Sequence, residues 1–143
     1  MNYFIKKENP SLKTAFTFIE LMVVIAILGL LAGIGVPLFM NKLEQSAKDT
    51  TKITLKATAQ ALDLYKLQIG TYPKRLEDLV EKPKGPDGSK WTSAFMEKTP
   101  LDGWKQEFYY KLTPNAKKPY ELYSYGKNGP DGASEDRISV WNI

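Results

Sequence analysis

Hydrophobic and polar positions divide the chain into a polar start, a long apolar run and a mixed remainder. Residues 16–40 are almost entirely apolar, and Glu20 is the only charged residue among them. The stretch 21–40 is about 20 residues long, which is enough for a helix to span a bilayer. A core helix of a soluble domain is the alternative, but a small domain cannot bury a helix that is apolar on all sides. The pattern therefore predicts a transmembrane helix.

Residues 41–70 change to a mixed pattern with helical spacing. One predicted face carries Ile53, Ala57, Ala61 and Leu64, and the roughly opposite face carries Leu55, Leu62, Tyr65 and Ile69. Two apolar faces indicate two partners, the protein's own head and neighbouring subunits. Burial between elements of one domain fits the same periodicity. Gly70 is expected to end a helix of about 50 residues, with a possible interruption at Pro37.

Residues 71–143 have the shorter pattern of a small globular head. A short helix is predicted over 75–81, a Pro- and Gly-rich loop over 82–90, a further helical turn over 91–98 and a turn over 100–104. Aromatic-rich segments predict strands at 108–112, 120–125 and 138–141. The expected fold class is α+β, in which a long N-terminal helix packs against an antiparallel sheet of about three strands.

Composition and charge weaken several functional classes. The chain of 143 residues contains no cysteine and no histidine, so the commonest general base and transition-metal ligand are missing, and no catalytic constellation is found. A membrane-anchored enzyme is therefore not favoured. The net charge is +4, of which the first fifteen residues supply +2 from three lysines and one glutamate. No basic stripe remains that would predict nucleic-acid binding.

The polar start determines the expected orientation. Lys6, Lys7 and Lys13 precede the apolar run, and no small-residue cleavage site of a secretory signal follows it. Positive charge on this side predicts a single-pass protein with a cytoplasmic N-terminus and an exported C-terminal part.

Glu20 needs an explanation of its own, because an unpaired carboxylate inside a membrane costs at least a few kcal/mol. One interpretation places it near the lipid headgroups. The other pairs it with a positive group of a neighbouring subunit, and a free amine created by a cut before Phe16 is the obvious candidate.

The segment TA-FTFIELMVVIAILGLLAGIGVP, with Phe16, Glu20 and Pro37, resembles the class III signal of type IV pilins and type II secretion pseudopilins. The resemblance implies that a prepilin peptidase removes the leader 1–15 by cutting between Ala15 and Phe16, and methylates Phe16. It also implies that Glu20 neutralises the amine of the adjacent subunit and that Pro37 marks a kink. The family usually has Gly at the position of Ala15.

The head narrows this resemblance. The segments ALDLYKLQIGTYP, LEDLVEKP, PLDGW and YSYGKNGPDGASED resemble the major pseudopilins of type II secretion, the general secretion pathway protein G family. One departure is DGWKQE at 102–107, where the family commonly has DPWGNP.

The resemblance implies a structural subunit and not an enzyme. Such a subunit is stored in the inner membrane and assembles with its own copies and other pseudopilins into a periplasmic filament that drives the export of folded proteins. Its other partners are the prepilin peptidase, the inner-membrane secretion platform and membrane lipid. A type IV pilin or minor pilin for adhesion, motility or DNA uptake is the alternative.

The loop at 124–136 is rich in glycine and oxygen-bearing side chains, although its order is not that of an EF-hand. On composition alone it is a solvated turn. The resemblance instead implies one calcium ion, held by Asn128, Asp131, Glu135 and Asp136, with possible backbone carbonyls from Leu122 and Tyr125. Asn128 stands where the family has Asp, so one unit of ligand charge is missing.

The three tryptophans and Asp63 have predicted roles in packing and on the surface. Trp91, Trp104 and Trp141 are interpreted as core anchors. Asp63 is expected to be solvated, or to form a salt bridge with a neighbouring subunit.

Overall fold

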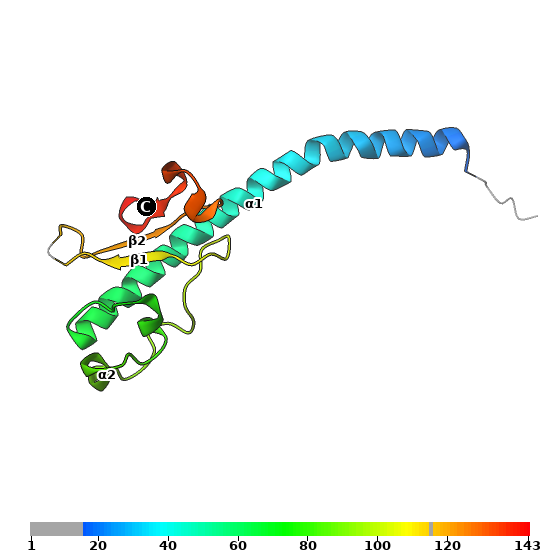
Figure 1. The fold of residues 1–143 in the computed structure, drawn as a ribbon. Coiled ribbons are helices and arrows are strands. Elements are labelled where there is room, and N and C mark those ends of the chain that lie inside the picture. Colours follow the sequence, from blue (N-terminus) through cyan, green and yellow to red (C-terminus); the bar gives the residue numbers. More distant parts are fainter. Residues whose placement is uncertain (1–15, 115) are drawn as a thin grey trace, which may run out of the picture. The chain divides into compact units, whose positions relative to one another are not determined.

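The computed structural model describes residues 16–114 and 116–143 (Figure 1). The expected leader 1–15, including Ala15 of the predicted cleavage site, lies outside the described residues. The chain divides into two compact units, one ending at Met40 and the other covering Asn41–Ile143.

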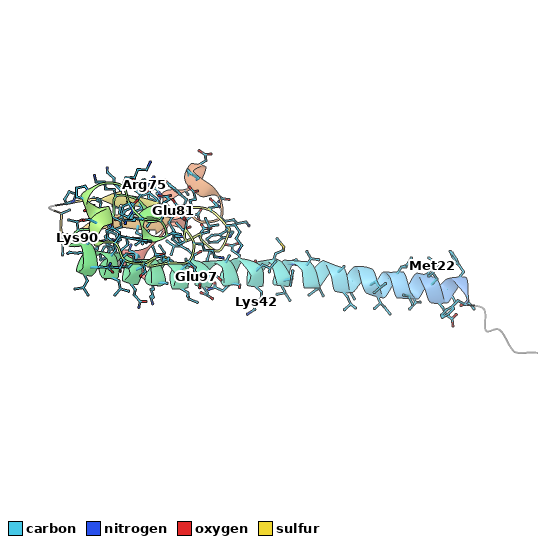
Figure 2. All side chains as sticks on the ribbon, turned by 90° about the horizontal axis from the view of Figure 1, so that it is seen from below. Met22, Lys42, Arg75, Glu81, Lys90 and Glu97 are labelled. Carbon is cyan, nitrogen blue, oxygen red and sulfur yellow. The ribbon has the colours of Figure 1, made fainter. Side chains whose placement is uncertain are left out.

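The first unit contains the beginning of helix α1, which extends over Phe18–Ile69. All residues from 16 to 40 are exposed, and Figure 2 shows their side chains projecting from the helix around Met22. The length and composition of this part are sufficient to cross a membrane. Pro37 lies within the helix. Because proline has no backbone N–H, the carbonyl of Gly33 lacks its usual helical donor.

The second unit buries one face of α1. Its buried residues recur every three or four positions, which is the period of a helix face. They are Thr51, Leu55, Thr58, Ala61, Leu62, Tyr65 and Ile69. This confirms the face predicted from Leu55, Leu62, Tyr65 and Ile69. The assignment of Ala61 to the opposite face was wrong, because its small side chain lies at the edge of the buried stripe.

The polar members of this face are satisfied locally, and the helix end follows the sequence signal. Thr51 Oγ1 and Thr58 Oγ1 each donate to the carbonyl four residues earlier, at 2.8 Å.

Gly70 adopts a φ of +102° and its N–H donates to the Lys66 carbonyl at 2.8 Å. A left-handed glycine directly after the last turn ends many helices, so the predicted stop at Gly70 is confirmed.

The sheet has three antiparallel strands in the order β1-β2-β3. The strands are β1 Tyr109–Leu112, β2 Tyr120–Ser124 and β3 Ile138–Ser139. Tyr110 lies opposite Leu122, and Ser124 lies opposite Ile138. Within the second unit, β1 and β2 lie beside α1 (Figure 1). The predicted α+β architecture is confirmed, with the third strand shorter than expected.

The core of the second unit forms where α1 meets the sheet and the connecting segments. It contains Leu55, Leu62, Tyr65 and Ile69 from α1, Leu76 and Leu79 from the following segment, and Phe108, Tyr120 and Leu122 from the sheet region. Trp91 packs against this core, as predicted. Trp104 is half-buried, and Trp141 is 38% exposed at the sheet edge, where its Nε1–H donates to the Tyr120 carbonyl at 3.0 Å. The interpretation of Trp141 as a core anchor was therefore wrong.

Three local predictions need correction. The predicted helix 75–81 is a 3-10 helix over Leu76–Leu79. The predicted loop 82–90 contains the short helix α2, Pro86–Lys90, which begins with a proline whose fixed φ suits a first helical position. The predicted strand 138–141 ends at Ser139, whose Oγ accepts from the Trp141 N–H at 3.3 Å as a 3-10 turn begins.

The helical turn predicted over 91–98 does not form. The N–H groups of Phe95 and Met96 both donate to the Leu79 carbonyl, at 2.8 and 3.1 Å. These donors are therefore used for a contact with a distant part of the chain instead of for a local turn.

Candidate functional site

The start of α1 brings together the residues that the sequence singled out for assembly. Glu20 Oε2 accepts a hydrogen bond from the Thr17 N–H at 2.8 Å, and Thr17 Oγ1 accepts from the Glu20 N–H at 3.3 Å. This reciprocal pair is a capping box, in which the residue before a helix and its third residue satisfy each other's backbone donors. Sequence reasoning missed this role, although the signal T-x-x-E is present at 17–20.

The capping box fixes the place of the Glu20 carboxylate. A negative charge in the first turn also interacts favourably with the helix dipole. An ionised carboxylate has room for about four hydrogen bonds, so the bond from Thr17 leaves capacity for a further donor. Phe16 is 91% exposed and directly precedes the cap. An amine formed at Phe16 would therefore lie at the same helix end as the carboxylate.

A second exposed apolar surface lies on α1 in the second unit. Ile53, Leu64 and Leu67 are 69%, 56% and 83% exposed. Beside Leu64 is a shallow hollow whose lining includes Ala57, Ala61, Phe95 and Met96. Of the two predicted apolar faces, the one that carries Ile53, Ala57 and Leu64 is therefore the exposed one.

The turn that contains Asp102 ties three parts of the second unit together. Asp102 is 2% exposed, and its Oδ1 accepts from the N–H groups of Trp104 and Gln106 at 2.9 and 2.8 Å. Its Oδ2 accepts from the Ser124 hydroxyl at 2.6 Å, and Ser124 Oγ accepts from the Gly126 N–H at 2.9 Å. One carboxylate thus connects the turn with the end of β2 and the loop that follows.

This turn departs from the family pattern at Gly103 and Lys105, and both residues have distinct roles in its geometry. Gly103 donates its N–H to Thr51 Oγ1 of α1 at 2.9 Å, a bond that the family's proline cannot make. Lys105 stands at the position of the family's glycine and has a φ of +67°, which is the left-handed region. A non-glycine residue in this region is strained, so Lys105 is a strained position of the turn.

The loop between β2 and β3 contains the predicted calcium ligands. Asn128, Asp131, Glu135 and Asp136 are all exposed. The structure brings Asn128 and Asp136 together, with Nδ2 donating to Oδ2 at 3.2 Å. In the part of the chain that the structure describes, no three Asp, Glu, His or Cys side chains form a group that could hold a metal.

Calcium takes six to eight oxygen ligands. Of the four predicted side chains, the structure brings together Asn128 and Asp136, so this arrangement of oxygen donors does not fit the ion. Leu122 lies inside β2 and Tyr125 directly after it. The calcium expectation stays a prediction from the resemblance, and the arrangement of these residues does not favour it.

The hollow beside this loop is lined by charges of both signs, with one more basic than acidic residue. Lys48 Nζ lies 2.9 Å from Glu44 Oε1, and Lys127 Nζ lies 3.7 Å from Glu44 Oε2. The Lys48 ammonium, and to a smaller extent that of Lys127, lowers the pKa of the Glu44 carboxyl. The adjoining hollow is lined by four basic residues, Lys48, Lys52, Lys127 and Arg137, and by three acidic residues, Glu44, Glu135 and Asp136.

Asp63 is exposed, as expected for a solvated residue. It accepts a hydrogen bond from the Tyr72 hydroxyl at 3.0 Å. A salt bridge to a neighbouring subunit stays a prediction.

Comparisons with known proteins agree with one another. A family model described as type II secretion system protein G matches residues 38–143, and the prokaryotic N-terminal methylation motif matches residues 11–36. A protein of Pseudomonas aeruginosa named type II secretion system core protein G is 40% identical over 135 residues, covering 91% of this chain and 94% of that protein. The protein of that name from Vibrio cholerae is 32% identical over 137 residues, covering 92% and 93%.

A solved structure supports the fold. The crystal structure of the major pseudopilin from the type 2 secretion system of enterohaemorrhagic Escherichia coli superposes with a TM-score of 0.61 at 24% identity. The similarity covers 73% of this chain and 94% of that chain. At this identity it shows the fold alone, and the fold is the one predicted from the sequence.

Proposed function

This chain belongs to the family of type II secretion system protein G, and from that premise we propose that it is the structural subunit of a type II secretion pseudopilus. The observation that carries the proposal is the pairing of two matches, a methylation motif over the start of an exposed apolar helix and the protein G model over the soluble unit. A type IV pilin or minor pilin is not favoured, because the matched family and the named relatives are those of type II secretion.

The first step of the proposed function is processing. A prepilin peptidase cuts between Ala15 and Phe16 and methylates the new amine of Phe16. The match of the methylation motif to residues 11–36 supports this step. The exposure of Phe16, one residue before the helix cap, supports it as well.

The second step is storage in the inner membrane. Burying a leucine, isoleucine, valine or phenylalanine side chain away from water is favourable by roughly 1.5–3 kcal/mol of free energy. Residues 21–40 expose many side chains of these types. Lipid provides that environment before assembly. The lysines before the apolar run favour a cytoplasmic N-terminus, with the second unit in the periplasm.

The third step is assembly into a periplasmic filament whose growth drives the export of folded proteins. In lipid, the Glu20 carboxylate has one donor from its own chain and is costly. In a filament, the methylated amine of a neighbouring Phe16 supplies the opposite charge. The exposed Ile53, Leu64 and Leu67 offer further contact surface to other copies or other pseudopilins.

The proposal gives the chain a structural role instead of a catalytic one, in keeping with its lack of histidine and cysteine. Its partners are copies of itself, other pseudopilins, the prepilin peptidase, the inner-membrane secretion platform and lipid.

Two substitutions at Glu20 test the assembly step. Glutamine also serves as the third residue of a capping box, so Glu20→Gln removes the charge and keeps the helix cap, whereas Glu20→Ala removes both. Both variants are expected to insert and to be cut before Phe16, which mass spectrometry of the N-terminus measures. Both are expected to yield far less filament than wild type when expressed with the secretion components.

Glu44→Gln is the matched control, since Glu44 is an acid on the same helix but outside the apolar run. It is expected to assemble normally. Wild-type amounts of filament from Glu20→Gln would refute the charge-pairing mechanism. An uncut N-terminus of the wild-type chain in the presence of the peptidase would refute the proposed function itself.

A further inference from the structure

We propose that the loop between β2 and β3 is closed by the chain's own side chains, chiefly the Gln106 amide, and that it needs no divalent cation. The proposal concerns the fold of the single subunit and does not rest on filament assembly. It arises from the disagreement between the donor set of this loop and the calcium site that the resemblance implies.

Gln106 occupies the inner side of the loop. Its Nε2 donates to the carbonyls of Gly126 and Lys127, both at 3.2 Å. Its Oε1 lies 3.0 Å from the point where a Cβ on Gly129 would stand, and Gly129 has a φ of +69°. In calcium-binding loops, backbone carbonyls that converge in this way are ligands of the ion. Here an amide group with two N–H donors already satisfies both carbonyls.

The two ends of the loop touch each other directly. A Cβ on Gly126 would stand 2.5 Å from the Asp136 carbonyl, so only glycine permits this approach. The Asn128 amide then spans the loop to the Asp136 carboxylate at 3.2 Å. The family's aspartate in place of Asn128 would put two carboxylates face to face and would need a cation between them. The asparagine needs none.

Positively charged side chains lie beside the loop. Lys127, a loop residue, reaches Glu44 on α1. Arg137 lies over the rings of Tyr123 and Tyr125, at 5.3 and 5.7 Å from their centroids. With Lys48 and Lys52 nearby, the hollow beside Asp136 has more basic than acidic residues. The four basic side chains would offset the attraction of the three carboxylates for a divalent ion placed there.

The experiment uses the full chain in detergent, and tryptophan fluorescence follows thermal unfolding of the second unit, which contains all three tryptophans. We expect the wild-type midpoint to be the same in calcium chloride and in a calcium chelator. A calcium-dependent rise of more than roughly 4 °C, the effect of about 1 kcal/mol in a unit of this size, would overturn the proposal. Calorimetric titration of the wild-type chain with calcium chloride is expected to show no saturable binding, and saturable binding would overturn the proposal as well.

Gln106→Glu tests the positive half of the inference. The new carboxylate faces the carbonyls of Gly126 and Lys127 with no proton to donate, so the midpoint in chelator is expected to fall by about 4–8 °C. Glu107→Gln, at the exposed neighbouring position, is the control and is expected to leave the midpoint unchanged. A Gln106→Glu variant with the wild-type midpoint would show that the amide does not hold the loop. The Glu20 variants report on assembly, so failure of either idea is distinguishable.

Discussion

Replacing Asp102 by asparagine is expected to lower the free energy of unfolding of the second unit by about 3 kcal/mol. The carboxylate is 2% exposed and accepts three hydrogen bonds, from the Trp104 and Gln106 N–H groups and from the Ser124 hydroxyl. The shape of asparagine is nearly the same, so the substitution changes charge and donor pattern while creating almost no cavity. The measured effect therefore reports on the hydrogen bonds.

The magnitude follows from what each bond loses. Hydrogen bonds to a charged group contribute about 1.5–3 kcal/mol and neutral ones about 1 kcal/mol, so weakening the two N–H bonds costs roughly 1–2 kcal/mol. The Ser124 hydroxyl meets an amide donor in place of an acceptor, while its Oγ still accepts from the Gly126 N–H. That mismatch costs roughly 1–2 kcal/mol more. The removed desolvation cost of a buried charge acts in the opposite direction.

Thermal unfolding of the full chain in detergent, followed by tryptophan fluorescence, measures the change. A loss of about 3 kcal/mol corresponds to a fall of about 12 °C for a unit of this size. Ser124→Ala is the matched variant and is expected to lose about half as much, because it removes one of the three bonds to the carboxylate together with the bond from the Gly126 N–H. The double variant is expected to lose less than the sum of the two. An unchanged or higher midpoint for Asp102→Asn would show that the desolvation cost of the carboxylate outweighs its hydrogen bonds.

Four smaller predictions, at three residues, can be measured in the same way. Lys105→Gly relieves the strain of a left-handed backbone, but it also increases the entropy of the unfolded chain. Stability is therefore expected to be unchanged or to rise by up to about 1 kcal/mol. A loss of more than about 1 kcal/mol would contradict the strain assigned to Lys105. The Tyr65 hydroxyl is buried without a hydrogen-bond partner in the described chain, so Tyr65→Phe is expected to be neutral or stabilising, and a clear loss would reveal a partner. Burial raises the pKa of Tyr65 to about 12. Its contribution to stability is therefore complete below the unfolded pKa of about 10 and is lost as pH rises from there towards 12. Over that pH range, Tyr65→Phe is expected to lose less stability than wild type. The pKa of Glu44 is lowered in the folded chain, so its contribution to stability is present above the unfolded carboxyl pKa and is lost as pH falls below that value. The stabilities of wild type and Glu44→Gln are therefore expected to converge on acidification. A difference in stability that stays constant with pH would contradict this.

The sequence predicted those parts of the fold that depend on local pattern. Helix α1 follows from the spacing of Leu55, Leu62, Tyr65 and Ile69, and its end follows from Gly70. The aromatic-rich segments at 108–112 and 120–125 contain β1 and β2. In each case, the residues that determine the element lie within the element or next to it.

The parts that the sequence did not predict depend on contacts between distant residues or on signals that point two ways. The segment 91–98 is not helical because its donors reach the Leu79 carbonyl. The composition of 82–90 indicates a loop, yet Pro86 also suits the first position of a helix. The hydrogen bond from Ser124 to Asp102 spans 22 residues and that from Gln106 to Gly126 spans 20, so no short motif shows them.

Part of the site was also open to a closer reading of the sequence. Glu20 is a costly charge in an apolar run, and its spacing of three from Thr17 is the sequence signature of a capping box. The same carboxylate is thus both a helix cap and the predicted partner of a neighbouring amine. Its local role is visible in the structure of the single chain, while its intermolecular role requires a second copy.

The position of the cap has a consequence for the entropy of assembly. The proposed cut before Phe16 would leave a single residue ahead of the Thr17 cap, so the mature N-terminus would have almost no loose end. Ordering each flexible residue costs about 1–2 kcal/mol, and a longer overhang would have to lose that freedom each time a subunit joined a filament. With Thr17 and Glu20 holding the first turn, the amine of Phe16 is presented on a chain end that is already ordered.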